Sequence, residues 1–300
     1  MSSDKLVTMP TTPWFIASNF RLQRAVGMTA SPYTGKQRTQ EFDRVSWEGD
    51  VTLPPMTREQ AIEWQVFLLE CVGVKNVFNF IDPDGKTPRG TYDGNYLAGE
   101  IRMDSGSNVN SVTLSFAASG STITAGTAIF DGLVAGDFFT VSGADNELNN
   151  GTHKITTKTS DTVVAVDSTL AQEANTASCK VRQNIKGSEA LSLAASSNTA
   201  TGTIKKGDYL SLYSGASALS PRVQLVMATA DASPTTQSGS PDHYSVPIQP
   251  KLRSDLTDTH FVGFSSAYNQ SRFRLTDNLT GWSANHLSLY GITLGFAEVI

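Results

Sequence analysis

Trp47-Glu48-Gly49-Asp50-Val51-Thr52-Leu53-Pro54-Pro55-Met56 is the stretch that decides the fold, because apolar and polar residues alternate along it. Counted from Val45, every second residue as far as Leu53 is apolar or glycine, and the residues between them are polar. A period of two is the pattern of a β-strand with one buried and one wet face. Proline donates no hydrogen bond to a sheet, so Pro54-Pro55 ends the strand. We therefore predict a strand over residues 45–53.

The residues that follow predict one α-helix, over residues 58–72. Thr57 is a suitable N-cap, and Gln60, three residues later, completes a capping box. Apolar residues recur at helical spacing and predict a face that packs on a sheet: Ala61, Trp64, Leu68 and Cys71, widened by Ile62 and Phe67. Gly73 is expected to stop the helix, because glycine readily adopts the left-handed conformation of a C-terminal cap.

Further apolar or alternating runs predict a mainly β chain around this helix. In the first part of the chain, residues 30–40 read as a turn-rich segment, and the expected strands are residues 14–26, 74–81 and 96–103. After residue 185, residues 231–242 read as a polar loop, and the expected strands are 189–195, 200–213, 222–230, 261–266, 271–276 and 287–300. One face of the last strand is apolar, with Tyr290, Ile292, Leu294 and Phe296. Its other face is small enough for another sheet or subunit to approach.

The composition changes between residues 105 and 184, where Ser, Thr, Ala and Gly dominate. Short β-branched runs at 138–141, 152–156 and 162–166 are separated by turn signals at Asn149-Asn150-Gly151 and Ser160-Asp161. The segment that begins at Gly136-Asp137 resembles the one that begins at Gly207-Asp208, and each reads as a turn followed by a strand. We predict a discontinuous domain of residues 1–104 and 185–300, a β-sandwich or barrel flanked by the helix, with a small all-β module inserted at 105–184.

Composition excludes some functional classes. The chain has 300 residues, 39% hydrophobic and 17% charged, with a formal net charge of −5. This balance argues against a protein that grips nucleic acid by neutralising phosphates. Residues 1–5 show no signal-peptide pattern, and no apolar run has the length of a membrane helix, so we expect a soluble protein made in a cytoplasm. Cys71 and Cys179 are too few for a disulfide framework and are expected to be reduced.

No catalytic, metal-binding or cofactor-binding constellation stands out. The four histidines (His153, His243, His260 and His286) are isolated from one another and from metal-ligand spacings, which favours packing or surface roles. Asp82-x-Asp84-Gly85 lacks the later ligands of a calcium loop, and no serine lies in a nucleophile elbow. Paired carboxylates for glycoside cleavage stay possible, because the two members of such a pair need not be adjacent in sequence.

The aromatic residues divide between core and surface. Four residues are expected to form core and helix packing: Trp47, Trp64, Leu68 and Phe296. Trp282 lies in a polar run and is the candidate for an exposed aromatic side chain that binds a sugar.

Several segments, in order, resemble the distal tail (tail-hub ring) proteins of long-tailed bacteriophages. They lie within residues 12–104 and 185–300 and comprise the turn at 31–35, the strand with Pro-Pro at 47–56, the helix that carries Trp64, Phe-x-Phe and Asp-Pro at 78–83, Gly-Asp-Tyr at 207–209, the turn at 248–253, Phe-Arg-Leu at 273–275, and the chain end at 296–300. The resemblance rests on the order and spacing of these segments, since each motif alone is common.

The resemblance implies a tail-tube-like fold and a structural, non-enzymatic role in the virion. In that family six subunits close into a ring, and their strands form an inner barrel around a channel for the genome and the tape-measure protein. The ring joins the tail tube protein to the hub and the adsorption apparatus. We accordingly expect a homohexamer with no cofactor, assembled in the host cytoplasm, through which DNA passes without specific binding. A tube or terminator ring would have the same fold.

Cyclic closure would also satisfy exposed strand edges, which otherwise invite uncontrolled pairing. We hypothesise that the polar face of the first strands lines the channel, through Asn19, Arg21, Gln23, Glu48 and Asp50. The alternative is an ordinary solvent-exposed face of a monomer. Two other classes stay open: a carbohydrate-binding β-sandwich protein, which predicts an exposed aromatic patch, and an enzyme acting on cell-wall polymers, which predicts carboxylates clustered in a cleft.

Overall fold

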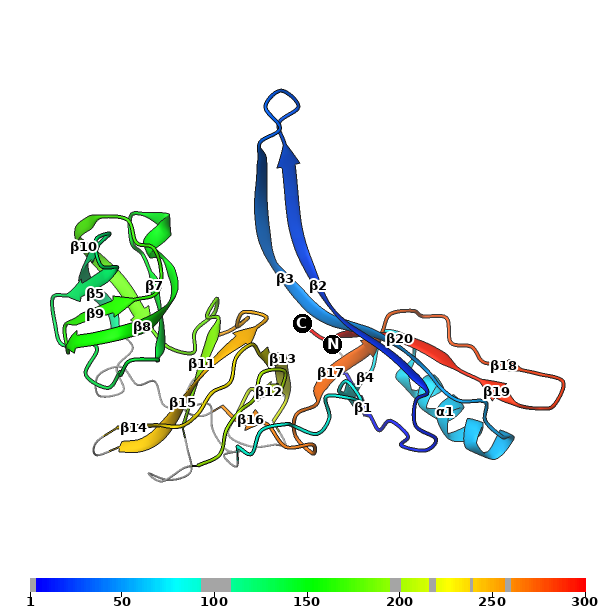
Figure 1. Cartoon of the computed structure of the whole chain (residues 1–300). Helices are drawn as coiled ribbons and strands as arrows, with labels where there is room; N and C mark the ends of the chain where they lie inside the picture. Colours follow the sequence, from blue (N-terminus) through cyan, green and yellow to red (C-terminus); the bar gives the residue numbers. More distant parts are fainter. Residues whose placement is uncertain (1–3, 93–108, 195–200, 216–219, 238–239, 257–259) are drawn as a thin grey trace. The chain divides into compact units, whose positions relative to one another are not determined.

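A computed structural model describes residues 4–92, 109–194, 201–215, 220–237, 240–256 and 260–300 (Figure 1). The described chain is mainly β with a single α-helix, as the sequence predicts. It divides into two compact units. Unit 1 comprises Met1–Lys86, Arg222–Leu225 and Gln270–Ile300, and unit 2 comprises Thr87–Pro221 and Val226–Asn269. The expected domains group residues 87–104, 185–221 and 226–269 differently from these units, and their boundaries stay a prediction. The expected strand at 96–103 lies outside the described residues.

Unit 1 is built on a six-stranded sheet. Its strands, in spatial order, are β1 (Leu6–Val7), β4 (Val77–Phe80), β17 (Ser271–Leu275), β20 (Thr293–Glu298), β3 (Gln37–Thr52) and β2 (Ala17–Ala30). The pairing is antiparallel except between β1 and β4. A short hairpin, β18 (Ser283–Ala284) and β19 (Tyr290–Gly291), also belongs to this unit. The last strand of the chain therefore lies between β3 and β17, near the middle of the sheet.

The strands of unit 1 differ in extent from the sequence prediction. The strand predicted at residues 45–53 is the second half of a longer β3, and the strand predicted at 14–26 is β2, which runs on to Ala30. Residues 37–40, expected to lie in a turn-rich segment, are instead a strand arm that pairs with residues 27–30 in a hairpin. The sequence pattern did not predict these arms, because a strand exposed on both faces shows no regular alternation of apolar and polar residues.

Helix α1 (Arg58–Cys71) covers one face of this sheet with five of its six predicted apolar residues, all except Ile62. The Thr57 amide donates to Gln60 Oε1 over 3.1 Å, which is one half of the predicted capping box. The left-handed C-cap is Val72, one residue before the predicted stop, and Gly73 continues with a positive φ of 60°. The side chains buried on the inner face are Ala61, Trp64, Phe67, Leu68 and Cys71.

Aromatic rings fill the space between α1 and the sheet. The rings of Phe80 and Phe296 have centroids 4.3 Å apart, and Phe20 stacks on Trp47 at 5.0 Å with an interplanar angle of 6°. Phe67 of the helix meets Phe78 of β4 edge-on at 5.3 Å. Offset and edge-to-face pairs of this kind add about 0.5–1.5 kcal/mol each to the gain from burying the rings.

A buried carboxylate closes the end of this core. Glu298 is 5% exposed. It accepts hydrogen bonds from the amides of Trp47 (3.3 Å) and Leu225 (2.7 Å) and from Ser271 Oγ (3.3 Å). Trp47 Nε1 donates in turn to the Leu225 carbonyl over 2.8 Å. A buried carboxylate is tolerated only when it is hydrogen-bonded. The partners of Glu298 come from different segments, so its hydrogen bonds link β3, β17, β20 and residues 222–225.

Unit 2 contains a closed six-stranded barrel. In order around the barrel the strands are β10 (Glu173–Arg182), β5 (Val109–Ala117), β6 (Thr122–Ala125), β9 (Val163–Val166), β8 (Gly151–Ser160) and β7 (Phe138–Ser142). Its core includes Phe116, Phe130 and Phe139, all fully buried. The barrel thus forms within the segment expected to be an inserted β module. Asn149, predicted to begin a hairpin turn, instead ends a short 3₁₀ helix, Glu147–Asn149.

A second sheet, mainly of unit 2, contains β11 (Ala190–Ala194), β15 (Ser240–Gln249), β13 (Arg222–Ala228), β12 (Tyr209–Tyr213) and β16 (Val262–Gly263), and the first four residues of β13 belong to unit 1. The short strand β14 (Thr235–Gln237) pairs with β15, so the predicted polar loop at 231–242 is partly strand. The strand predicted at 200–213 is shorter than expected. Residues 205–208 form a turn instead, and before it Ile204 makes an isolated bridge to Ala232.

The two similar Gly-Asp segments adopt the same hydrogen-bonded turn in unit 2. Gly136 and Gly207 have positive φ angles of 101° and 93°. In each turn the following aspartate accepts a hydrogen bond through Oδ2 from the amide three residues earlier, over 2.9 Å for Asp137 and 2.8 Å for Asp208. The aspartate carbonyl also accepts an amide from a partner strand in both cases. The short sequence likeness therefore predicts one local structure used twice.

We predict that Gly49→Ala destabilises the chain by roughly 1–3 kcal/mol, because it overpacks the core. A Cβ atom on Gly49 would lie 2.8 Å from Phe296 Cζ and 3.0 Å from the Asn19 carbonyl oxygen, which are too close for ordinary contact. Urea denaturation measures the loss. The matched control is Gly281→Ala, since a Cβ atom there meets nothing within 4 Å. Equal stability of the two variants would contradict this account of the core.

Candidate functional site

The outermost strand of the unit 1 sheet, β2, has a free edge. It is 14 residues long, pairs with β3 on one side, and has no strand on the other side among the described residues. A long free edge presents unpaired backbone amides and carbonyls, which favour pairing with another chain. This edge is therefore the first candidate surface for assembly.

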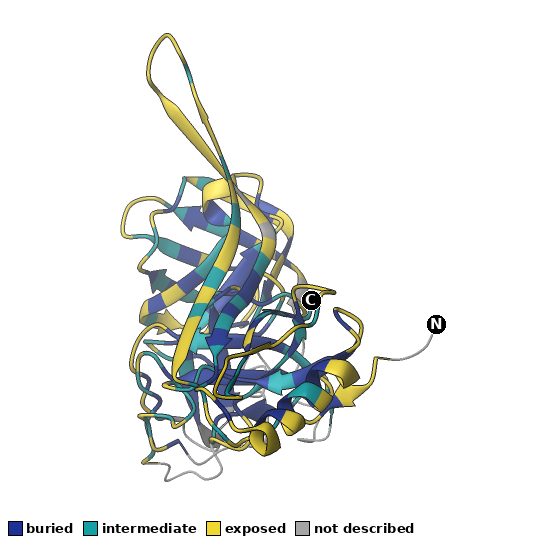
Figure 2. Cartoon of the chain, turned by 90° about the vertical axis from the view of Figure 1, so that its right-hand side faces the viewer, coloured by how far each residue is buried: buried dark blue, intermediate teal, exposed yellow. Residues whose placement is uncertain are grey.

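The distal part of the β2–β3 hairpin, residues 25–44, extends past the rest of its sheet (Figure 1). The β2–β3 register shifts between Arg24 and Val26, and β20 pairs only with residues 48–52 of β3. This ribbon therefore has two strands, and most of its residues of described burial are exposed (Figure 2). Isolated two-stranded hairpins are marginally stable in water.

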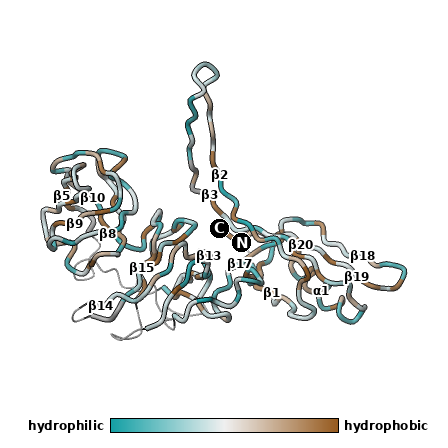
Figure 3. Tube along the Cα trace, viewed as in Figure 1, coloured by the Kyte–Doolittle hydropathy of each residue, from teal (hydrophilic) through white to brown (hydrophobic). Residues whose placement is uncertain are grey.

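Large apolar side chains of the ribbon face solvent. Val26 is 53% exposed, Met28 64% and Phe42 49%, and Tyr33 in the tip is 96% exposed. Apolar and polar segments alternate along the ribbon (Figure 3). Exposed apolar residues gathered on one element mark an interaction surface more often than scattered single ones do. The sequence offered a signal in Val26, Met28 and Phe42, which flank the expected turn-rich segment at residues 30–40 and to which the sequence analysis assigned no surface role.

The five predicted channel-lining residues lie on one face of β2 and β3. Asn19 is opposite Asp50 and Arg21 is opposite Glu48 in the strand register, and Gln23 follows on the same face of β2. Arg21 forms ion pairs with Asp50 (2.8 Å) and Glu48 (3.8 Å). The face continues over β20, where Gly295 lies opposite Asp50 and Ala297 opposite Glu48, so the small residues of the last strand flank the charged ones. Whether this face lines a channel stays a prediction.

Helix α1 carries a second apolar stripe on its outer side. Ile62, Val66 and Leu69 are 43%, 50% and 59% exposed. The sequence analysis placed Ile62 on the packing face, and this was wrong, because its position relative to Trp64 turns it away from the sheet. The spacing of i, i+4 and i+7 was the signal for a separate stripe. The helix thus has one apolar face for its own core and another that is open.

The predicted packing residues and the predicted exposed aromatic differ sharply in burial. Trp47, Trp64, Leu68 and Phe296 are all buried in unit 1. Trp282 is 42% exposed beside β18. Leu279 and Leu287 of the same short hairpin segment are 83% and 66% exposed, which the sequence analysis did not single out.

Two histidines, His153 and His243, form buried hydrogen bonds with residues that are not their sequence neighbours. His153 is buried in the barrel and lies 3.0 Å from both Ser168 Oγ and the Asn149 carbonyl oxygen. His243 is buried with Nε2 2.7 Å from Asp137 Oδ1, and that same oxygen accepts from Ser245 Oγ over 2.8 Å. The serine thus bonds the carboxylate rather than the imidazole, which is not the arrangement of an activated nucleophile. This cluster joins the barrel to β15.

The two cysteines are buried as free thiols. Burial raises the pKa of the Cys71 thiol to about 12, and burial also raises the pKa of Cys179. Reactive cysteines need a lowered pKa and access to solvent, so both thiols serve in packing. Within the described residues, no three His, Cys, Asp or Glu side chains gather in a group that could hold a metal ion.

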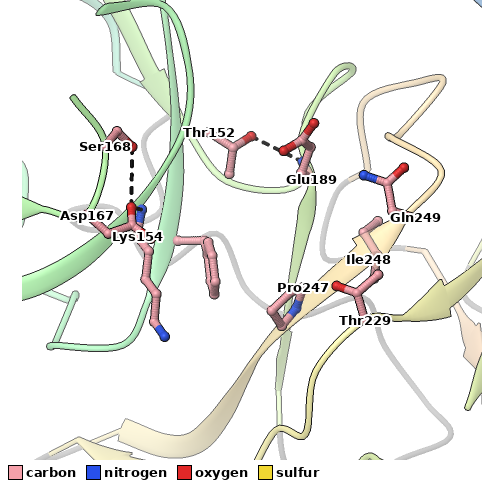
Figure 4. A pocket seen from close by; sticks show the side chains of 10 residues that line it. Thr152, Lys154, Asp167, Ser168, Glu189, Thr229, Pro247, Ile248 and Gln249 are labelled. Carbon is pink, nitrogen blue, oxygen red and sulfur yellow. Dashed lines mark hydrogen bonds between the residues drawn. The ribbon is translucent and has the colours of Figure 1, made fainter. Parts of the chain in front are cut away.

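A polar cleft with a cavity volume of about 310 Å³ lies in unit 2 (Figure 4). Its walls come from the barrel and from the second sheet: Phe138, Thr152, Lys154, Asp167, Ser168, Glu189, Thr229, Pro247, Ile248 and Gln249. It contains two carboxylates, and that of Glu189 pairs with Lys251 at 3.1 Å. The sequence analysis missed this cleft, because its residues come from segments up to about a hundred positions apart.

No known protein-family model and no curated protein sequence matches the chain. None of the helical structure in the described residues has the length and apolar character needed to cross a membrane.

We predict that acid weakens the fold through His153. Burial lowers the pKa of His153 below its ordinary value of 6.5, although the Asn149 carbonyl and Asp167 oppose the shift. The unfolded chain therefore takes up the proton first, so the contribution is full above about pH 6.5 and falls as the pH drops towards the lower folded pKa. The urea midpoint should decrease over this range and decrease less in His153→Gln. The exposed His286 supplies the control variant His286→Gln, and an unchanged pH slope in both variants would contradict the assignment.

Proposed function

We propose that the chain is a structural virion protein, a subunit of a hexameric distal tail ring that joins a tail tube to the hub and encloses the genome channel. The observation that carries the proposal is the unpaired β2 edge with its exposed hairpin ribbon. The ordered segments that resemble distal tail proteins supply the ring and the channel. The proposal assigns no catalytic role to the chain.

The hairpin ribbon and the outer stripe of α1 are complementary in character. Residues 25–44 carry three basic and two acidic residues, whereas residues 58–71 carry one basic and three acidic residues. Each also exposes apolar side chains: Val26, Met28 and Phe42 on the ribbon, and Ile62, Val66 and Leu69 on the helix. Two different surfaces of one chain that fit each other generate a head-to-tail contact, and such contacts close into rings when the rotation permits. Opposite charge would also steer the encounter of two copies.

The polar face of β2 and β3 is suited to line a channel for nucleic acid. Asp50 is a half-exposed carboxylate, and Glu48 and Asp50 outnumber the basic Arg21 on these positions. A face without excess positive charge does not hold a phosphate backbone, so DNA could move past it. Gly295 and Ala297 lie beside these charged residues, and their small side chains project little from the sheet into the proposed channel.

We predict that the double substitution Val26→Glu and Met28→Glu abolishes ring formation and leaves the fold intact. Both side chains are exposed, so the loss of burial within the chain is small, while glutamates would face the acidic helix of the next copy. Mass measurement at high protein concentration and electron microscopy of assembled particles give the readout. The control is Leu148→Glu, since Leu148 is 63% exposed on the barrel.

Rings with six subunits that persist in the double variant would contradict the role of the ribbon. Loss of rings in the barrel control as well would show a general effect of added charge. The position of the chain in an image of the intact particle would distinguish a distal ring from a tube or terminator ring.

We predict that Glu48→Lys together with Asp50→Lys allows assembly but slows DNA release. The surface ion pairs with Arg21 are worth at most about 1 kcal/mol, so the fold tolerates their loss. The new lysine ammonium groups would attract the DNA phosphates in the channel and so slow the passage of the DNA. A DNA-release assay on complete particles measures the rate. Unchanged assembly together with unchanged release would place this face outside the channel.

A further inference from the structure

We propose that the polar cleft of unit 2 binds a neutral saccharide. The cleft has a volume of about 310 Å³, within the range of ligand sites, which starts near 300 Å³. Its walls come from the barrel strands β7 and β8, the loop after β9, and the strand β15 with its neighbours (Figure 4). Nothing in the ring assignment requires this cleft.

The charges of the cleft balance. Lys154 and Asp167 lie on the barrel wall, and Glu189 on the opposite wall pairs with Lys251 at 3.1 Å. Lys251 does not itself line the cleft, but it pairs with Glu189, so the remaining lining charges of Lys154 and Asp167 balance each other. A polyanion would meet both carboxylates, and a polycation would meet the Lys154 ammonium group, so a ligand without net charge fits best.

The polar groups suit a ligand that both donates and accepts hydrogen bonds. Hydroxyl groups of Thr152, Ser168 and Thr229 line the cleft together with the amide of Gln249 and the two carboxylates. Saccharide hydroxyls are donors and acceptors at once, and a carboxylate accepts the stronger, charge-assisted bonds from them.

The cleft also has apolar surface on which the C–H groups of a sugar ring can pack. The half-exposed ring of Phe138 has Lys154 Nζ 5.7 Å from its centroid, and the side chains of Pro247 and Ile248 form part of the opposite wall. A sugar presents C–H groups on the faces of its ring and hydroxyls around the rim. A few polar groups placed around an apolar surface are typical of sites that fix the orientation of a small ligand.

Hydrogen bonds hold the walls in place before any ligand arrives. Thr152 Oγ1 lies 3.0 Å from Thr140 Oγ1 and accepts the Glu189 amide over 3.1 Å. The Lys154 amide donates to Asp167 Oδ1 over 3.2 Å, and the Ile248 amide donates to the Glu189 carbonyl over 2.8 Å. A site fixed in this way loses little entropy on binding, which favours measurable affinity for a small ligand.

The test is a titration of the full-length chain with neutral trisaccharides, namely maltotriose, cellotriose, mannotriose and N-acetylchitotriose, and separately with inorganic phosphate. Calorimetry or NMR should detect at least one saccharide at millimolar concentration. Asp167→Asn keeps the oxygen that accepts the Lys154 amide but loses the charge, and Phe138→Leu keeps an apolar side chain but loses the aromatic ring. Asp167→Asn should weaken binding at least about tenfold, the effect of losing one charge-assisted hydrogen bond. Phe138→Leu should weaken it at least about threefold, because the sugar ring loses an aromatic surface to pack on.

The matched control is Asp161→Asn, which removes a carboxylate in the same barrel that pairs with Lys158 outside the cleft. It should bind as the unmodified chain does, and thermal melts of all variants check that they fold. Binding of phosphate in place of sugar, no binding by any saccharide, or equal losses in Asp161→Asn would each overturn the proposal. Because the cleft lies within a single chain, failure of ring assembly would leave this result unchanged.

Discussion

The core of unit 1 depends on the packing of the last strand between two earlier ones. β20 pairs with β3 on one side and with β17 on the other, and Phe296 occupies the space that Gly49 leaves free. The Glu298 carboxylate then connects this strand to the Trp47 and Leu225 amides. A buried carboxylate that loses one of these donors would carry a large desolvation penalty. The two ends of unit 1 in the sequence are thus joined by strand pairing, by the aromatic contacts of Phe296 and by the buried Glu298 carboxylate.

This arrangement leaves β2 at the outside of the sheet, and the proposed function follows from that position. A hairpin that leaves its sheet after residue 25 gains only partial burial from its own chain, although it carries Val26, Met28 and Phe42. Natural sheets usually protect such edges with charges, bulges or covering elements. Here the bulge near Arg24 is present, and a covering element is not found among the described residues. In the proposed ring a second copy of the chain would supply the missing cover through the outer stripe of α1, a helix that carries three acidic residues and one basic residue.

Unit 2 contains the same type of Gly-Asp turn in two places. The Gly-Asp turns before β7 and β12 have the same backbone hydrogen bonds. In the barrel the second carboxylate oxygen of Asp137 reaches His243 and Ser245 on β15, and in the second sheet Asp208 Oδ1 accepts the Arg89 amide. Each turn thus begins a strand and ties it to a more distant segment. The Asp137 tie joins the barrel to β15, the strand that also supplies Pro247 and Ile248 to the cleft.

The sequence alone determined the elements whose pattern is local. Alternation along residues 45–53 indicated β3, the capping residues and apolar spacing indicated α1, and the mainly β class followed from the remaining short runs. These predictions succeeded because strand and helix periods of neighbouring residues reflect burial directly. Only the tertiary structure decided that the closed barrel lies in residues 109–182, that β20 enters the middle of the sheet, and that Asp167 and Glu189 line one cleft. Such relations join residues distant in sequence, and the loop closures that bring them together leave no periodic signal in the chain.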